Sequence, residues 1–311
     1  MRKYILAKFF VAVLFMASTI TEPIHAQNAS DQYFTLVVYY IRHAQSCANA
    51  ASSFQALKYT DPELTNCGLF RSLQAGTSFQ EHLRNQSITL DFRGASRLRR
   101  AKETMLMMAY DDFFNKGATL FQLPYIGESV TGGVALLPEN TAEESAVQIP
   151  KILRTFPGLT SAQINTKYSD NIGKALVSYS SFRDNTLRQI AKDLYNANPK
   201  STYYAAIVTH SLFMRNHIEC KRPNGDKPAN NEIYSRTYVF KKSDGSRVKE
   251  SACIREIQFE RPDKIADKDK GRCSYMRKNS QGPEVYNFPA HESAQEAVNW
   301  MSQQVSPECQ K

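Results

Sequence analysis

Apolar residues along the chain gather in short runs that alternate with helical patterns. Residues 33–41 form a nearly continuous run of β-branched and aromatic side chains, which is typical of a strand buried on both faces. Residues 203–209 form a second run of this kind. Shorter or weaker strands are predicted at residues 88–92, 119–123, 233–240 and 254–259.

Two segments show the three- and four-residue spacing of a helix. The first stripe consists of Leu98, Ala101, Met105 and Met108. Ser96 is its expected N-terminal cap, and residues 182–195 carry the second stripe. Strands that alternate with helices predict an α/β fold, a layered sandwich with a largely parallel central sheet flanked by helices.

Residues 27–311 are expected to form one domain with two additions. Residues 132–181 mix polar, apolar and proline positions, and we expect an inserted lid region over the sheet edge. Residues 260–311 are predicted to be a cysteine-containing C-terminal extension, whose charged part Cys273 would hold in place.

The first 26 residues have the pattern of a secretory signal. A basic start precedes the apolar run 9–17, and Ala26 places a small residue at the expected cleavage point. The run is shorter than the roughly 20 residues that span a bilayer, which disfavours a membrane anchor. A secreted or extracytoplasmic mature protein beginning near Gln27 is expected, without stable membrane insertion after cleavage.

The chain is basic, with 39 Lys and Arg against 30 Asp and Glu. Its formal net charge falls from +9 to +7 without the signal, which contains Arg2, Lys3, Lys8 and Glu22. The densest basic cluster consists of Arg93, Arg97, Arg99, Arg100 and Lys102. This cluster is too short for a nucleic-acid arm and suits a small anionic substrate. Arg99 and Lys102 are expected on a solvated helix face.

The sequence contains six cysteines, all beyond the signal, and an even count in an exported chain predicts three disulfides. The candidates are Cys47, Cys67, Cys220, Cys253, Cys273 and Cys309. Connectivity stays open, with Cys47 to Cys67 as one candidate pair. The motifs C-x-x-C and H-E-x-x-H are absent, so we expect neither a metal nor a cofactor. No cysteine is followed six residues later by the arginine of a cysteine phosphatase.

Both strong strands run directly into a histidine. Arg42 and His43 follow the first strand, and His210 follows the second. In open α/β sheets the ligand lies beyond the carboxyl ends of the strands, so both histidines are expected to face one pocket. The planar donors of Arg42 and the helix starts would favour an anion there.

These residues form part of an ordered set that resembles the histidine phosphatase superfamily, in its phosphoglycerate-mutase-like branch. The matching positions are Arg42-His43-Ala44 with Ser46 and Asn49, Leu64-Thr65 with Gly68, Ser96-x-Leu98-x-Arg100-Ala101-x-x-Thr104, Glu128, Thr209-His210-Ser211, and the late strand Asn231-Glu232-Ile233-Tyr234. The acid-phosphatase branch is less similar, because its Arg-rich first motif and its His-Asp motif are absent.

The resemblance implies a phosphomonoesterase with His43 as the nucleophile. His43 would attack phosphorus as a neutral ring whose other nitrogen is held as a donor. Arg42, Arg100 and His210 would hold the phosphoryl oxygens without a metal ion, with Ser46, Asn49 and Ser211 as further candidates. Glu128 would protonate the leaving group.

The sequence differs from the family pattern at several positions, and other functions are possible alternatives. Ala44 and Ser211 stand where the family often has glycine, and the Arg-His-Tyr-Gly of glycolytic mutases is missing after Glu128, which favours hydrolysis over a mutase reaction. Glu103, Glu143 and Glu144 are alternative proton donors. A catalytically silent anion-binding protein would share the pocket, whereas a glycosidase would need a pair of carboxylates that the strand ends do not offer. The expected partner is a small phosphate ester rather than a nucleic acid, with substrate and oligomeric state open.

Overall fold

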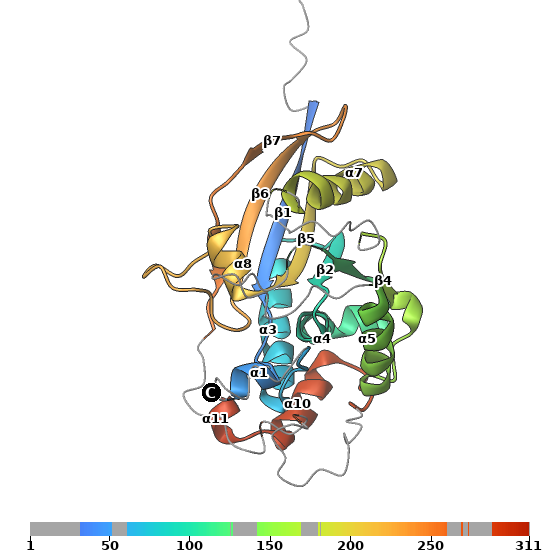
Figure 1. Ribbon diagram of the computed structural model, residues 1–311, viewed down its shortest axis with the longest axis vertical. Helices are drawn as coiled ribbons and strands as arrows, with labels where there is room; N and C mark the ends of the chain where they lie inside the picture. The colour runs from blue at the N-terminus through green and yellow to red at the C-terminus, as the bar shows by residue number, and fades with distance from the viewer. Residues whose placement is uncertain are drawn as a thin grey trace, which may run out of the picture.

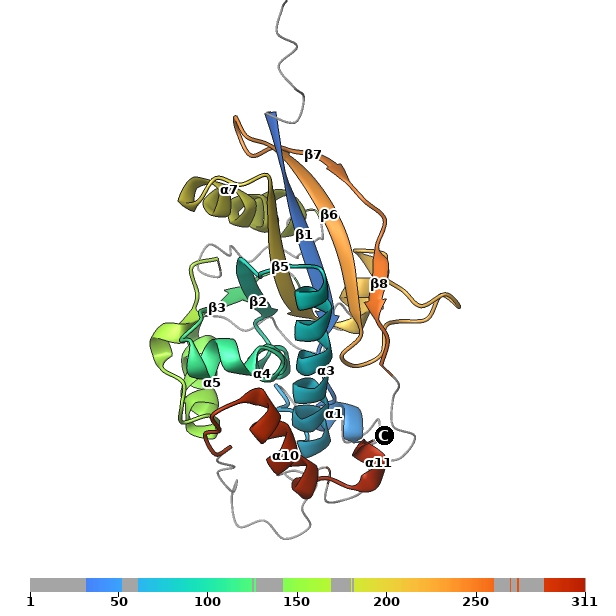
Figure 2. The same cartoon turned by 180° about the vertical axis from the view of Figure 1, so that it is seen from behind.

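The computed structural model describes residues 32–51, 61–124, 126, 142–168, 180, 182–259, 269, 273 and 288–310. They form a central sheet with helices on both faces (Figures 1 and 2). The expected signal segment and Glu128 lie outside the described residues, as do 132–141 of the insertion. The boundaries of the predicted lid and extension stay predictions.

The sheet has eight strands in the order β4-β3-β2-β5-β1-β6-β7, with β8 paired to β6. The strands are β1 (Tyr33–Arg42), β2 (Phe92–Ser96), β3 (Leu120–Leu123), β4 (Ile164–Asn165), β5 (Thr202–Thr209), β6 (Ile233–Lys241), β7 (Arg247–Glu250) and β8 (Ile254–Ile257). Pairing is parallel from β4 to β1 and antiparallel beyond it. The predicted α/β fold is therefore confirmed, with an antiparallel edge. A short turn between β6 and β7 reverses the chain, as antiparallel pairing allows.

Both faces of the central strands are buried, as the apolar runs predict. Tyr39 and Ile41 of β1 belong to one core, whereas Leu36 and Val38 belong to the other. Successive side chains of a strand point to opposite faces, so one continuous apolar run supplies both cores.

Helices cover the two cores on opposite sides of the sheet (Figures 1 and 2). One side carries α3 (Asn66–Asn85), α4 (Arg99–Met108), α5 (Ala142–Thr155) and α10 (Ala294–Gln304), and the other carries α7 (Arg188–Ala197) and α8 (Ser211–Asn216). Shorter elements are α1 (Cys47–Ala50), η2 (Asp111–Asn115), η3 (Ser161–Gln163), η4 (Phe182–Leu187) and α11 (Pro307–Gln310). The helical stripe at residues 182–195 thus corresponds to η4 and α7.

The strand predicted at residues 88–92 is displaced along the chain. The observed strand β2 begins at Phe92, the last residue of the predicted range. The Ile88 N–H donates to the Leu83 carbonyl at 2.8 Å, so this apolar stretch closes the end of α3 instead. The shift places Ser96 inside β2, and α4 begins later with Leu98 as its cap residue. The expected role of Ser96 as that cap is therefore wrong.

All six cysteines are paired, which confirms the predicted three disulfides. The bridges are Cys47–Cys273, Cys67–Cys309 and Cys220–Cys253. The candidate pair Cys47–Cys67 is wrong because each of these residues bonds to the C-terminal part, which packs on α3 through α10 and α11 (Figure 2). Cys273 is thus bonded to Cys47 of α1, whereas most of the charged segment around it lies outside the described residues. Asp269 supports this docking, since its buried carboxylate accepts the Ser306 N–H at 2.6 Å.

Among the helices that the structure describes, none combines the length and apolar character needed to cross a membrane.

Candidate active site

The carboxyl ends of β1, β2 and β5 meet at one edge of the sheet. The parallel register pairs Arg42 with Thr209, and Ala95 with Val208. The residues that follow these pairs are His43, His210 and Ser96, so strand pairing brings them together. The two imidazole rings lie 4.9 Å apart between centroids.

His43 is fixed in one tautomer by its own backbone. Its Nδ1 lies 2.7 Å from the Ala44 carbonyl oxygen, which can only accept, so Nδ1 carries the hydrogen. The Nε2 atom accepts a hydrogen bond of 3.2 Å from Nε of Arg100. His43 is buried, and its unprotonated Nε2 faces the guanidinium group.

Arg100 lies between the two histidines. Its Nη2 is 3.2 Å from Nδ1 of His210, and because arginine only donates, that nitrogen must accept. The other nitrogen of His210, Nε2, therefore donates to the Ser96 hydroxyl at 2.7 Å. Ser96 thus orients His210, a role that sequence reasoning missed because serine after a strand is also a typical helix cap.

Arg42 is held from beside the site by residues 228–232. Its Nη1 donates to the Pro228 carbonyl at 2.7 Å, and the Asn230 amide donates to the His43 carbonyl at 2.7 Å. The buried Glu232 accepts from Nη2 of Arg222 at 2.8 Å and from the Ala229 N–H at 2.7 Å. The similarity of residues 231–234 to a family strand was the sequence signal for this loop, although the roles of Asn230 and Glu232 were not inferred.

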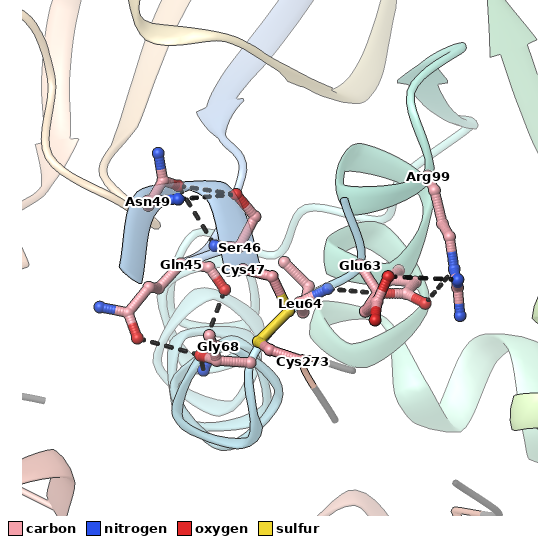
Figure 3. The surroundings of a disulfide bond; sticks show 11 residues. Gln45, Ser46, Cys47, Asn49, Glu63, Leu64, Gly68, Arg99 and Cys273 are labelled. Carbon is pink, nitrogen blue, oxygen red and sulfur yellow. Dashed lines mark hydrogen bonds and ion pairs between the residues drawn. A yellow bond between two sulfur atoms is a disulfide. The ribbon is translucent and has the colours of Figure 1, made fainter. Parts of the chain in front are cut away.

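The backbone after His43 contacts α4 and α3. The Ala44 N–H donates to the Thr104 hydroxyl at 3.0 Å, and that hydroxyl donates to the Arg100 carbonyl at 2.7 Å. The Gln45 carbonyl packs against Gly68, where a Cβ atom would lie 2.1 Å from its oxygen (Figure 3). Glycine at this point lets α3 approach the loop that follows His43.

Ser46 and Asn49 bond to each other around the first turn of α1 (Figure 3). The Asn49 amide oxygen accepts from the Ser46 N–H at 3.2 Å, and the Ser46 hydroxyl accepts from the Asn49 N–H at 3.4 Å. This capping box gives both residues a structural role. Ser211 is buried as the first residue of α8, directly after His210. Phosphate binding by these three residues stays a prediction.

Glu103 is bound to backbone and arginine partners. Its Oε2 accepts the Leu64 N–H at 2.8 Å, and its Oε1 accepts from Nε of Arg99 at 2.9 Å. A carboxylate engaged in this way is poorly suited to donate a proton. The side chains of Glu128, Glu143 and Glu144 lie outside the described part of the chain.

The expectation that Arg99 and Lys102 form a solvated face is wrong. Lys102 is fully buried, and its Nζ donates to Oε1 of Gln122 at 2.6 Å. Burial lowers the pKa of Lys102 to about 7, although the negative charge of Asp61 opposes this shift more than the positive charge of Arg97 assists it. Arg99 pairs with Glu103, and its Nη2 reaches the Thr155 hydroxyl of α5 at 3.4 Å. Helix α5 therefore contacts this face of α4.

Within the described residues, no group of three or more His, Cys, Asp or Glu side chains is arranged to hold a metal ion.

Comparisons with known proteins give only distant similarity. No family model and no curated protein matches the sequence. The fold is similar to the protein histidine phosphatase SixA complexed with tungstate, at 13% identity, covering 70% of this chain and 96% of that one, with a TM-score of 0.34. It is similar to the ecdysone phosphate phosphatase from Bombix mori at 12% identity, with 72% and 96% coverage and a TM-score of 0.41. A phosphoglycerate mutase from Bacillus anthracis is 15% identical, with 71% and 94% coverage and a TM-score of 0.36. The candidate function therefore rests on the side chains of the site.

Proposed function

We propose that this chain is a secreted phosphatase of the histidine phosphatase superfamily, which hydrolyses a phosphate monoester through a phosphohistidine on His43. The observation that best supports this proposal is the state of His43. Its Nδ1–H is bound to the Ala44 carbonyl, which leaves the Nε2 lone pair beside a guanidinium group. A nucleophilic nitrogen next to a fixed cation is what attack on a phosphoryl group requires.

In the first step, the Nε2 lone pair of His43 forms a bond to phosphorus while the bond to the ester oxygen breaks. Arg42 and Arg100 donate N–H groups to the phosphoryl oxygens, on which negative charge is spread. His210 adds a further donor once Nδ1 is protonated, because Ser96 already holds its other nitrogen. The leaving oxygen takes a proton from an acid, for which we propose Glu128.

In the second step, water attacks the phosphohistidine. The acid that was deprotonated in the first step takes a proton from this water as its oxygen bonds to phosphorus. The bond between phosphorus and nitrogen then breaks, inorganic phosphate leaves, and His43 regains its neutral ring with the lone pair on Nε2. Hydrolysis rather than transfer to a second substrate is proposed because the mutase sequence after Glu128 is missing.

Export is supported by two independent features. The first 26 residues have the signal pattern, and all six cysteines form disulfides, which persist in oxidising compartments.

The test is the turnover of a panel of phosphate esters by the purified, disulfide-bonded protein. His43→Ala should lower kcat at least about 1,000-fold, because no other group replaces the covalent step. His82→Ala, which changes a partly exposed histidine on α3, is the matched control and should keep the wild-type rate. Near-normal turnover in His43→Ala would refute the mechanism.

A further inference from the structure

Asn231 forms a β-bulge beside the catalytic histidine. The Arg42 N–H donates to the Glu232 carbonyl at 3.1 Å, and the Arg42 carbonyl accepts the Asn231 N–H at 3.0 Å. Two consecutive residues therefore oppose Arg42, at the point where β1 ends and His43 follows. Bulges next to active sites redirect a side chain.

The backbone of Asn231 is in the left-handed region, with φ at 63°. Glycine is the residue that this bulge position favours, since it adopts positive φ without a steric cost. Asparagine tolerates the conformation less well. An asparagine at this point suggests that its side chain has a use that glycine could not supply.

The amide oxygen of that side chain is buried and unsatisfied. Asn231 is 2% exposed, and its amide oxygen has no hydrogen-bond partner in the part of the chain that the structure describes. Buried polar atoms almost always have a partner, so each exception requires an explanation. Left-handed non-glycine residues and unsatisfied buried polar atoms both recur at functional sites.

The neighbours of Asn231 hold it firmly in place. Asn230 bonds to the His43 carbonyl, and the Pro228 carbonyl binds the Arg42 guanidinium. On the other side, Glu232 is anchored by Arg222. The backbone of Asn231 is thus bound to Arg42, which precedes His43, and lies at the same end of β1 as the proposed phosphate site.

From this geometry we infer that the side-chain amide of Asn231 hydrogen-bonds the phosphoryl group of the substrate. The inference rests on the proposed function and adds a neutral ligand to its cationic ones. The amide nitrogen can donate to an ionised phosphoryl oxygen, and the amide oxygen can accept from a protonated one. A half-turn of the amide group exchanges the positions of its nitrogen and oxygen. It would therefore suit phosphate in either ionisation state.

Two substitutions separate a binding role from a conformational one. Asn231→Gly keeps the left-handed backbone and deletes the amide, whereas Asn231→Asp keeps the shape and places a negative charge beside the phosphate. Ser87→Gly is the matched control, because Ser87 is exposed after α3 and also has a positive φ, of 55°.

The probes are inorganic phosphate and tungstate, titrated by calorimetry, with kcat and KM for a phosphate ester measured in parallel. Both Asn231 variants should bind the oxyanions at least tenfold more weakly, and kcat/KM should fall, whereas Ser87→Gly should match the wild type. Far-UV circular dichroism and thiol titration would verify folding, and Asn231→Asp decides the matter if the glycine variant does not fold.

Wild-type oxyanion affinity in Asn231→Gly would overturn the inference, since only the backbone would then matter. If the wild-type protein hydrolyses esters and this variant does so equally well, the inference fails while the proposed function stands. If the wild-type protein binds oxyanions but hydrolyses no ester, the proposed function fails, and weaker binding by the variants would still support the contact.

Discussion

Replacing Lys102 with methionine should stabilise the protein, and the gain should depend on pH. Lys102 is fully buried on α4, and burial lowers its pKa from the ordinary 10.5 to about 7. Between these pH values the unfolded chain holds a proton on this amine that the folded chain has released. Because the unfolded state binds more protons, wild-type stability should rise with pH across this window.

The magnitude follows from the two pKa values. Each pH unit between them corresponds to about 1.4 kcal/mol. Burying the protonated amine of Lys102 therefore reduces the free energy of unfolding by on the order of 5 kcal/mol below pH 7. At pH 9 about 2 kcal/mol of this cost remains. Methionine removes this cost at both pH values. Against the gain stands the lost hydrogen bond to Gln122, about 1 kcal/mol for the neutral amine, and its greater strength for the charged amine is already contained in the shifted pKa. The stabilisation by Lys102→Met should therefore be about 2 to 3 kcal/mol larger at pH 6 than at pH 9.

Urea unfolding with the disulfides intact, at pH 6 and pH 9, measures this difference. The control is Lys116→Met, because the Lys116 side chain is 69% exposed and its replacement should change the free energy of unfolding by less than about 0.5 kcal/mol. An equal effect of Lys102→Met at both pH values would show that the amine keeps the same charge throughout, and would refute the reasoning.

Two further predictions concern the proton donor and the catalytic loop. Glu128→Gln should slow hydrolysis of alkyl phosphates at least tenfold more than hydrolysis of nitrophenyl phosphate. The reason is that the stable nitrophenolate anion needs less protonation when it leaves. Equal losses in kcat for both esters would show that Glu128 is not the donor. Gly68→Ala should destabilise the protein by at least about 2 kcal/mol and lower kcat, because the new Cβ would lie 2.1 Å from the Gln45 carbonyl oxygen. Thermal unfolding checks this, and an unchanged Tm with unchanged turnover would contradict it.

The strongest parts of the fold were predictable because their signals are local. Residues 33–41 and 203–209 are apolar on both faces, and the structure places them as β1 and β5 in the centre of the sheet. His43 and His210 follow these two strands directly. The apolar pattern that predicted the strands therefore also predicted that the two histidines lie close together. Strand pairing then brings the two rings together, as the crevice rule predicted.

Other features depend on contacts that no local pattern records. Lys102 is buried and bonded to Gln122 of β3, and β3 and α5 pack against α4 although both lie outside its local sequence. Cys47 bonds to Cys273 because the C-terminal part returns across α1 and α3, although Cys67 lies much closer in sequence. The strand at β2 was misplaced because Ile88 closes a helix with the same apolar character that a strand would use.

The nitrogen that carries the phosphoryl group tests the central claim most directly. The Nδ1–H of His43 is bound to the Ala44 carbonyl, so only Nε2 is free of hydrogen and can attack. A labelled nitrophenyl phosphate mixed with the protein, quenched in alkali, and followed by peptide mapping and phosphorus NMR should show phosphohistidine at His43, substituted on Nε2. Label on Nδ1, on His210, or on a serine or threonine hydroxyl would contradict the mechanism.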